Sequence, residues 1–278
     1  MTAVVTAARA HDDVRDALRP LDAIGLDELV TSAALLTRVD RKYVLTVDDA
    51  VTVLGALAEQ GGARVLEMDG NRQFGYESVY FDTSDLASFR LTATRRRRRF
   101  KVRTRTYLDS GDSFLEVKTR AARGTTLKQR EPHLDDPAVL GDGCAFVATT
   151  LTTEGVRAAD RMHLEAGLVS RYRRTTIHLP GPDGGARATL DTGLTWELGH
   201  GPVGRPVMRA VPHLVIVETK GGSTPSSLDR ILWRHGHRPE RISKYGTGMA
   251  LLRPDLPDGP WRRVIRRHLT DPSHDRSI

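Results

Sequence analysis

The fold is decided by residues 101–107, which read KVRTRTY. Lys101, Arg103 and Arg105 stand at alternate positions, separated by Val102 and Thr104. Because successive side chains of a β-strand point to opposite faces of the sheet, a strand here places all three basic side chains on one face. The sequence therefore predicts a strand with one strongly basic face.

The same alternation of charged residues recurs in other predicted strands. The pairs are Asp40 and Lys42, Glu116 and Lys118, Lys128 and Arg130, and Glu218 and Lys220. For one strand alone, the solvated face of a half-buried sheet explains such a pair. Glu218 fits that explanation poorly, because it follows the apolar run LVIV at residues 214–217, which is typical of a buried strand. Both interpretations stay open for a single strand, and the repetition favours charges that point inward.

A closed antiparallel β-barrel accounts for charged residues on buried strands. Its outer face can be apolar where helices cover it, while its inner face is polar and surrounds water or a ligand. Many cations around one lumen would repel one another unless a polyanion lay among them. We therefore expect an α+β fold whose basic lumen binds a triphosphate, with Glu116 and Glu218 as candidate ligands of a divalent metal between phosphate oxygens. The residues expected to project into this single lumen are Lys42, Arg103, Arg105, Lys118, Arg187, Glu218 and Lys220.

Composition narrows the classes of partner. The formal net charge of +7 and the sequence pI near 9.8 favour an anionic ligand. Only 5% of the residues are aromatic, so little material exists for base stacking and no nucleic-acid partner is expected. The single cysteine, Cys144, excludes an intrachain disulfide and a multi-cysteine zinc site, and we expect it to be a small buried side chain. With no signal-peptide pattern and no long apolar run, the sequence predicts a cytoplasmic protein.

The length of 278 residues, with its turn signals and periodicity, predicts a single domain with additional elements. We expect a mobile leader at 1–20, a tunnel domain at 21–253 and a tail at 254–278. Period-two segments joined by Gly- and Asp-rich turns predict strands that pair as antiparallel hairpins. Helical spacing marks the other segments. The predicted strands are 38–45, 78–82, 101–108, 113–120, 125–131, 170–179, 187–191 and 214–220, and the predicted helical segments are 21–36, 46–60, 135–167, 225–235 and 243–252.

Short motifs, in order along residues 36–252, resemble the VTC domain. That family is the polyphosphate-polymerase branch of the triphosphate tunnel metalloenzyme superfamily, which also contains the CYTH phosphatases. Each motif is weak alone, and their common order is specific. The motifs are DRKY at 40–43, SVYFDT at 78–83, KVRTRTY at 101–107, LEVKT at 115–119, RYRRT at 171–175, RATLDT at 187–192, IVETK at 216–220 and SKYG at 243–246.

The resemblance implies a fold, an activity and a set of site residues. The fold would be a closed tunnel of eight antiparallel strands with flanking helices. The activity would be transfer of the γ-phosphoryl group of ATP to polyphosphate, with Mn²⁺ or Mg²⁺ bound through Glu218. Residues that match the family's phosphate-binding positions are Lys42, Arg103, Arg105, Lys118, Arg174, Arg187 and Lys244.

Further basic residues of the predicted strands are candidate phosphate ligands. They are Lys101, Lys128, Arg130, Arg171, Arg173 and Lys220. Arg171 and Arg173 compete with Arg174, because a shift of one residue in register moves a side chain to the other face of the sheet.

Departures from the family pattern leave the activity open. CYTH triphosphatases begin with Glu-x-Glu-x-Lys, whereas this chain has Arg38, Asp40 and Lys42 at those places. The replacement of the first carboxylate by Arg38 favours transfer to a phosphate chain over hydrolysis. Metal-dependent triphosphatase activity, and a non-catalytic polyphosphate-binding module of a membrane assembly with a membrane-protein partner, remain alternatives. The run Arg95–Arg99 is either a solvated loop or a basic mouth that guides long polyphosphate.

Overall fold

A computed structural model describes residues 11–32, 39–120, 126–157, 159–181, 185–199 and 207–270. The chain divides into two compact units. The first unit contains residues 1–75, 172–195 and 210–241, and the second contains residues 76–171, 196–209 and 242–278. Each unit is described below by itself.

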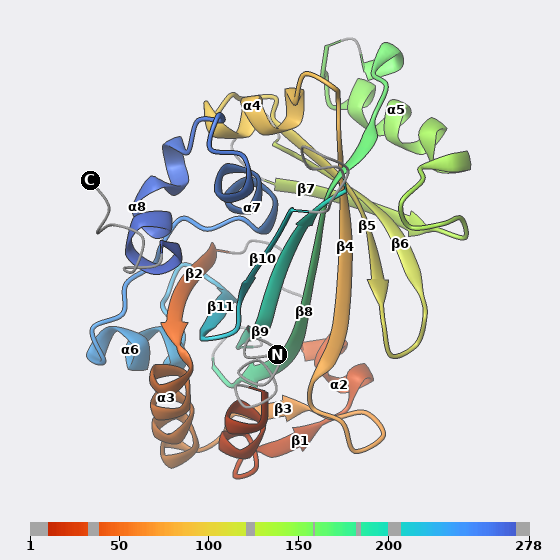
Figure 1. The fold of residues 1–278 in the computed structure, drawn as a ribbon. Helices are drawn as coiled ribbons and strands as arrows, with labels where there is room; N and C mark the ends of the chain where they lie inside the picture. The colour runs from red at the N-terminus through yellow and green to blue at the C-terminus, as the bar shows by residue number, and fades with distance from the viewer. Residues whose placement is uncertain are drawn as a thin grey trace, which may run out of the picture. The chain divides into compact units, whose positions relative to one another are not determined.

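The first unit combines a twisted set of strands with two covering helices. Its elements are β1 (Asp22–Ile24), α2 (Leu26–Ser32), β2 (Val39–Thr46), α3 (Val47–Gln60), β3 (Arg64–Leu66), β11 (Leu214–Gly221) and α6 (Ser227–Arg234), with parts of β8 (Glu165–Leu179) and β9 (Ala186–Leu198). Helices α3 and α6 lie beside β2 and β11 (Figure 1).

Local sequence explains why α3 covers this sheet. Thr46 caps the helix by accepting a hydrogen bond from the Asp49 N–H, and Gly61 ends it with φ of 78°. One stripe of the helix, which includes Val53 and Leu57, is buried in the core of this unit. The same core contains the alternate residues of β2 and β11 whose side chains point toward α3, so the charged residues between them point to the other face.

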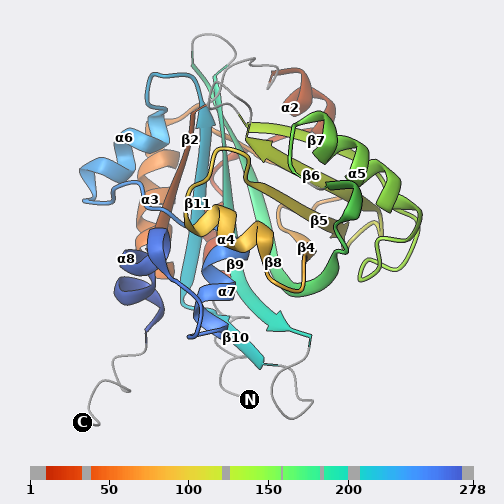
Figure 2. The same cartoon turned by 90° about the horizontal axis from the view of Figure 1, so that it is seen from above.

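The second unit has the long, charged strands at its centre. Its elements are β4 (Phe74–Asp82), α4 (Ala87–Ala93), β5 (Phe100–Tyr107), β6 (Ser113–Arg120), β7 (Thr126–Pro132), α5 (Cys144–Thr153), β10 (Val207–Val211), α7 (Lys244–Leu252) and α8 (Arg262–Val264), with short 3-10 turns at Gly141–Gly143, Ala159–Arg161 and Gly259–Trp261 and a π turn at Ile265–Leu269. β4 and β10 each extend by a few residues into the first unit. Helix α5 packs on β6, as Figure 2 shows.

The described strands confirm an α+β fold with an eight-strand antiparallel path and flanking helices. The strand order is β2-β11-β9-β8-β4-β5-β6-β7, with β8 and β9 running through both units. In the described residues, β2 and β7 at the two ends of this path are not paired with each other. Closure of the sheet into a barrel is therefore not detected and stays a prediction.

Residues on either side of the main sheet's strands in the sequence contribute buried side chains to the two units. Residues 11–17 are helical, and Val14 and Leu18 are fully buried in the core of the first unit. In the second unit, Trp261 and Leu269 are buried although they follow Pro254, Pro257 and Pro260 of the predicted tail. The division into leader, domain and tail stays a prediction. None of the described helices is long and apolar enough to cross a membrane.

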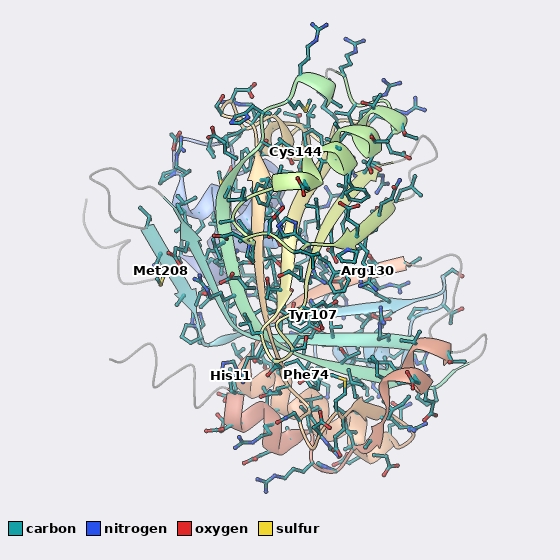
Figure 3. All side chains as sticks on the ribbon, turned by 90° about the vertical axis from the view of Figure 1, so that its right-hand side faces the viewer. His11, Phe74, Tyr107, Arg130, Cys144 and Met208 are labelled. Atoms are coloured by element: carbon teal, nitrogen blue, oxygen red, sulfur yellow. The ribbon has the colours of Figure 1, made fainter. Side chains whose placement is uncertain are left out.

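Cys144 differs from expectation. It begins α5 and is exposed (Figure 3). The reason is its place in the first turn, before Val147 and Leu151, which are the residues of α5 that pack into the core.

Candidate functional site

Three neighbouring strands of the second unit form a face that is almost entirely basic. In the registers of β5, β6 and β7, Lys101, Lys118 and Lys128 lie in one row. Arg103, Glu116 and Arg130 form the next row. We call this surface the basic face, and its members are Lys101, Arg103, Arg105, Lys118, Lys128, Arg130 and the carboxylate of Glu116.

The opposite face of the same strands explains why these charges share one side. Val102, Leu115 and Val117 are at most 1% exposed and pack under α5 with Val147 and Leu151. Burial of each such aliphatic side chain contributes about 1.5–3 kcal/mol, so the sheet cannot turn over without losing its core. The alternating sequence therefore fixes the basic face on the side that α5 does not cover.

Glu116 is the charge centre of the basic face. It is 1% exposed, and its Oε2 accepts two hydrogen bonds from Arg103, at 2.8 Å from Nε and 2.6 Å from Nη2. Lys128 and, at 3.8 Å, Arg105 form ion pairs with Oε1. Burial alone would raise the pKa of Glu116, but the charges of Arg103, Arg105 and Lys128 hold it far below its ordinary value. One carboxylate therefore faces three cations, which leaves an excess of positive charge.

The arginines of the basic face are oriented by aromatic rings. Arg103 lies over the ring of Tyr80 and also donates to its hydroxyl group at 3.2 Å. Arg105 lies 5.7 Å from the ring centre of Tyr76, and its buried Nε has no hydrogen-bond acceptor among the described residues. Arg130 on β7 lies 4.8 Å from the ring centre of Phe114. These rings hold the guanidinium groups while leaving donors for a ligand.

Helix α7 is anchored next to the start of β5. Ser243 caps the helix, and its hydroxyl group accepts a hydrogen bond from Lys101 Nζ at 2.8 Å. The carbonyl oxygen of Lys244 accepts a 2.6 Å bond from Trp196 Nε1. A Cβ atom at Gly248 would lie 2.4 Å from Trp196, so glycine permits this close approach. The SKYG segment thus has a packing role that holds Lys244 in the first turn of the helix.

The first unit contains a second group of predicted site residues, which we call the Glu218 cluster. In the strand register Glu218 faces Lys42 on one side and Thr189 on the other, and Lys220 faces Asp40 and Arg187. Glu218 forms ion pairs with Lys42 and, at 3.2 Å, with Lys220. The cluster consists of Lys42, Arg174, Arg187, Asp191, Glu218 and Lys220.

Arg174 and Asp191 form a bidentate pair within this cluster. Arg174 Nε and Nη2 donate to Asp191 Oδ1 and Oδ2 at 2.6 and 2.8 Å. Burial would lower the pKa of Arg174, but Asp191 raises it well above its ordinary value. Burial would raise the pKa of Glu218, and the charges of Lys42, Lys220 and Arg174 hold it well below its ordinary value. Glu218 is thus held in its ionised form, and both Glu218 and Asp191 are bound to cations.

Arg171 and Arg173 lie on the other side of β8 from Arg174. Both are exposed, whereas Tyr172 between them is buried and stacks with Arg174 at 5.2 Å. Arg171 pairs with Glu77 and Glu197, at 2.7 and 2.6 Å. Strand alternation therefore places Arg171 and Arg173 on the opposite side of β8 from the Glu218 cluster. Of the three arginines between which the sequence could not decide, Arg174 is the one in the cluster.

The structure adds residues that the motifs did not single out. Asp191, inside the RATLDT motif, is 1% exposed and holds Arg174. Arg120 has the same parity as Glu116 and Lys118 and continues their face toward the end of β6. Arg99 is near it, since the charge of Arg120 contributes, after burial, to lowering the pKa of Arg99. The alternation of charged residues in the sequence could by itself have identified Arg99 and Arg120 as candidates.

The surroundings of Glu116 and Glu218 show what kind of metal site these residues could form. Among the described residues, no three His, Cys, Asp or Glu side chains come together as a metal site. Glu116 lies among cations in the second unit, and Glu218 lies in the first unit, in a cluster whose other carboxylate, Asp191, is bound to Arg174. Such a carboxylate fits a Mg²⁺ or Mn²⁺ ion only if phosphate oxygens supply other ligands, which is how Mg²⁺ is bound in many phosphate-transfer sites. A metal with its phosphate ligand fits these residues, and a metal alone does not.

A family model described as the VTC domain matches residues 37–253. The chain belongs to the VTC domain family. The match includes both the basic face and the Glu218 cluster, and it confirms the family that the ordered motifs resemble. Arg103 and Glu218 belong to different units, so their expected position in one lumen stays a prediction for this VTC domain.

The solved structures to which the chain is similar are distant. A conserved hypothetical protein of Pyrococcus furiosus has 11% identity and a TM-score of 0.39, over 75% of this chain and 99% of that chain. A Pyrococcus horikoshii protein has 14% identity and a TM-score of 0.40, over 76% and 97%. A Hippeastrum protein, named as an adenylyl cyclase with a dominant triphosphatase activity, has 14% identity and a TM-score of 0.39, over 77% and 96%. At these scores the likenesses carry no functional conclusion. No curated protein matches the chain.

Proposed function

We propose that this VTC domain is a polyphosphate polymerase that transfers the γ-phosphoryl group of ATP to the end of a polyphosphate chain. The observation that carries the proposal is the basic face, where Lys101 and Lys118, both half-buried, lie directly opposite each other and Lys118 also faces Lys128. Like charges in that position destabilise a sheet, by about 0.2–1 kcal/mol for each pair. Their gathering is understandable if the bound state contains a polyanion.

A phosphate chain suits this face better than other anions. Arginine offers planar pairs of donors to phosphate oxygens, and lysine offers a mobile point charge. Arg103 and Arg105 are fixed by aromatic rings, while the lysine row adds charge beside them. A row of donors that continues over three strands matches a ligand whose charges repeat along its length. In transfer, these side chains position the chain and stabilise charge on the moving phosphoryl group.

The Glu218 cluster enters the proposal through the family positions that its residues match. Lys42, Arg174 and Arg187 would bind phosphate oxygens, and Lys220 would add to them. Glu218 would hold the divalent ion, Mn²⁺ or Mg²⁺. When bound, such an ion neutralises phosphate charge and polarises the phosphoryl oxygens. We leave Arg171 and Arg173 out of this site because they lie on the opposite side of β8.

We favour transfer over hydrolysis because the carboxylates near the two groups of site residues are poorly suited to activate water as a base. Asp40 is exposed and faces Lys220, and Arg38 lies outside the described residues. Glu116 and Glu218 are both engaged by cations and have lowered pKa values, so neither is a strong base for activating water. A phosphate chain end is already an anion and needs no such base.

The test is an incubation of the pure protein with ATP and Mn²⁺, in which ADP, free phosphate and polyphosphate are followed together. The proposal predicts ADP release with matching growth of polyphosphate, reduced at least tenfold in Arg105→Ala. Arg253→Ala is the matched control, because Arg253 is an exposed arginine paired with Asp255. Free phosphate in place of polyphosphate would identify a triphosphatase, and binding without turnover would identify a binding module.

A further inference from the structure

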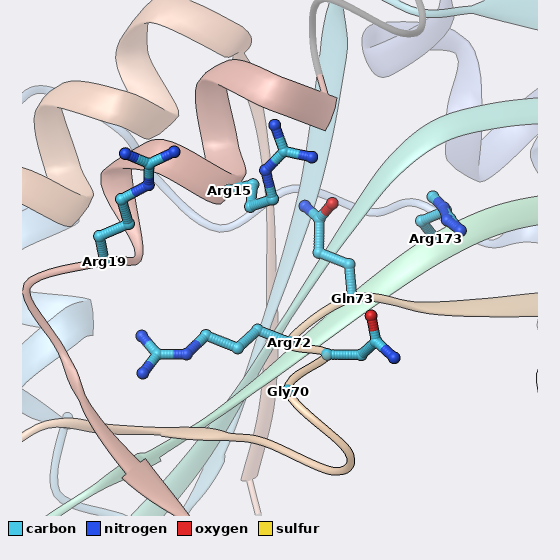
Figure 4. A pocket seen from close by; sticks show the side chains of 7 residues that line it. Arg15, Arg19, Gly70, Arg72, Gln73 and Arg173 are labelled. Atoms are coloured by element: carbon cyan, nitrogen blue, oxygen red, sulfur yellow. The ribbon is translucent and has the colours of Figure 1, made fainter.

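A pocket of about 440 Å³ lies in the first unit, apart from both groups of site residues. Its lining comes from the N-terminal helix, from the loop between β3 and β4, and from β8 (Figure 4). The lining residues are Arg15, Arg19, Gly70, Asn71, Arg72, Gln73 and Arg173. No acidic side chain of the described residues lines it, and four of the lining residues are arginines.

Strand alternation separates this pocket from the Glu218 cluster. Arg173 lines the pocket, and its neighbour Arg174 belongs to the cluster. Consecutive side chains of a strand leave opposite faces of the sheet. His11 and Thr192, which share a 2.7 Å contact, lie near Arg173, since its charge contributes to the electrostatic surroundings of His11. The pocket is therefore a different site from the one proposed for catalysis.

Arg72 lines the pocket and is held in place by its hydrogen bonds. Its Nε donates to Glu67 at 2.7 Å, and its Nη1 donates to the carbonyl oxygens of Leu18 and Leu21, at 2.8 and 3.0 Å. These bonds tie the turn after the N-terminal helix to the loop before β4. The side chain is thus built into the structure, and its Nη2 makes no hydrogen bond within the described part of the chain.

The other arginines differ in how much of their charge is already balanced. Arg15 and Arg19 pair with Asp12 and Asp16 on their own helix, at 2.8 and 2.9 Å, and both are largely exposed. Such exposed pairs are weak and exchange readily with a stronger acceptor. Arg173 has no carboxylate partner among the described residues. Asn71 and Gln73 also line the pocket, and their side-chain amides make no hydrogen bond among the described residues.

We infer that this pocket is a second anion site, which binds a small soluble ligand carrying a phosphate or diphosphate group. Convergent arginine forks and amide donors are the chemistry that recognises phosphate oxygens. The cavity volume lies in the range of small-molecule sites, so the ligand is a compact phosphate compound, not an extended chain. Binding there would brace the N-terminal helix against β8 and the loop before β4.

The experiment uses inorganic pyrophosphate as the probe and arginine modification as the readout. The full chain is treated with phenylglyoxal, with and without pyrophosphate and without metal, and labelled arginines are mapped by mass spectrometry. We expect pyrophosphate to slow labelling of Arg15 and Arg173 several-fold and to leave Arg171 unchanged. Arg171 is the internal control because it is exposed on the same side of the same strand.

Calorimetry of variants separates this site from the basic face. In an Arg105→Ala background, Arg173→Gln should weaken pyrophosphate binding on the order of tenfold, since one charge-assisted contact is lost, whereas Arg171→Gln should not. Unchanged labelling of Arg173, or equal affinity in Arg173→Gln, would overturn the inference. Protection by phosphatidylglycerol vesicles but not by pyrophosphate would also overturn it, in favour of a lipid surface.

Discussion

Lys101 and Lys118 lie directly opposite each other on β5 and β6, with both side chains on the face that α5 leaves uncovered. Lys118 in turn faces Lys128 on β7. A sheet selected for stability alone would place opposite charges or apolar groups at these positions. The row is therefore a feature whose benefit comes from a ligand.

Replacing Lys118 should separate stability from binding. Lys118→Gln removes a like charge from the middle of the row, so the ligand-free protein should be more stable, by up to about 1 kcal/mol. Tripolyphosphate binding should weaken by about 1.5–3 kcal/mol, because a charge-assisted contact is lost. Thermal unfolding and calorimetry on the same preparation check both changes. A variant that is less stable and binds normally would show that Lys118 has a structural role.

Glu116 should make the stability of the protein depend on pH. Its folded-state pKa is lowered, so its contribution is fully present above the ordinary carboxyl pKa, near 4.3, and is lost as the pH falls toward the lower folded value. At pH 7, Glu116→Gln should be less stable by about 3 kcal/mol, because it leaves buried cations without a counter-ion. The difference should shrink below about pH 4.5. Urea unfolding at several pH values measures it, with the exposed Glu165→Gln as the control.

Glu218→Gln tests the proposed metal ligand. The variant keeps the shape of the side chain and removes one negative charge from among Lys42, Lys220 and Arg174. We expect tripolyphosphate to bind at least as tightly without metal, while Mn²⁺-dependent turnover falls by tenfold or more. Turnover and thermal stability are measured together. Near-normal turnover by a folded variant would remove Glu218 from the mechanism.

His11 reports on the charge of the arginine pocket. Burial, followed by the charge of Arg173, lowers the pKa of His11, while Asp12 acts in the opposite direction. Arg173→Gln should therefore raise the pKa of His11 toward its ordinary value near 6.5. An NMR titration of the imidazole resonances follows this shift. An unchanged pKa in the variant would mean that Arg173 lies too far away to act on His11.

Much of the fold could be predicted from alternation and from caps. β6 has the residues that the sequence predicts, and Thr46 and Ser243, which cap helices in the structure, are of residue types that favour that position. The charged parity of KVRTRTY and LEVKT also gave the side of the sheet that carries the basic face. These features are local, because they depend on strand geometry and on a few neighbouring residues.

Other features depend on contacts between distant segments. Arg174 could not be distinguished from Arg171 and Arg173 until the buried Tyr172 fixed the parity of β8. The burial of Val14 and Leu18 depends on a core formed by strands far along the chain. The arginine pocket likewise joins three separate segments. No single stretch of sequence contains such information.

The central claim is that the basic face binds a phosphate chain, and calorimetry of tripolyphosphate with wild type, Arg105→Ala and Arg253→Ala tests it most directly. Arg105 has a buried Nε without an acceptor among the described residues, so its loss should weaken binding by about 1.5–3 kcal/mol with little change in Tm. Arg253→Ala should bind as the wild type does. Equal affinities for all three proteins, all of them folded, would contradict the claim.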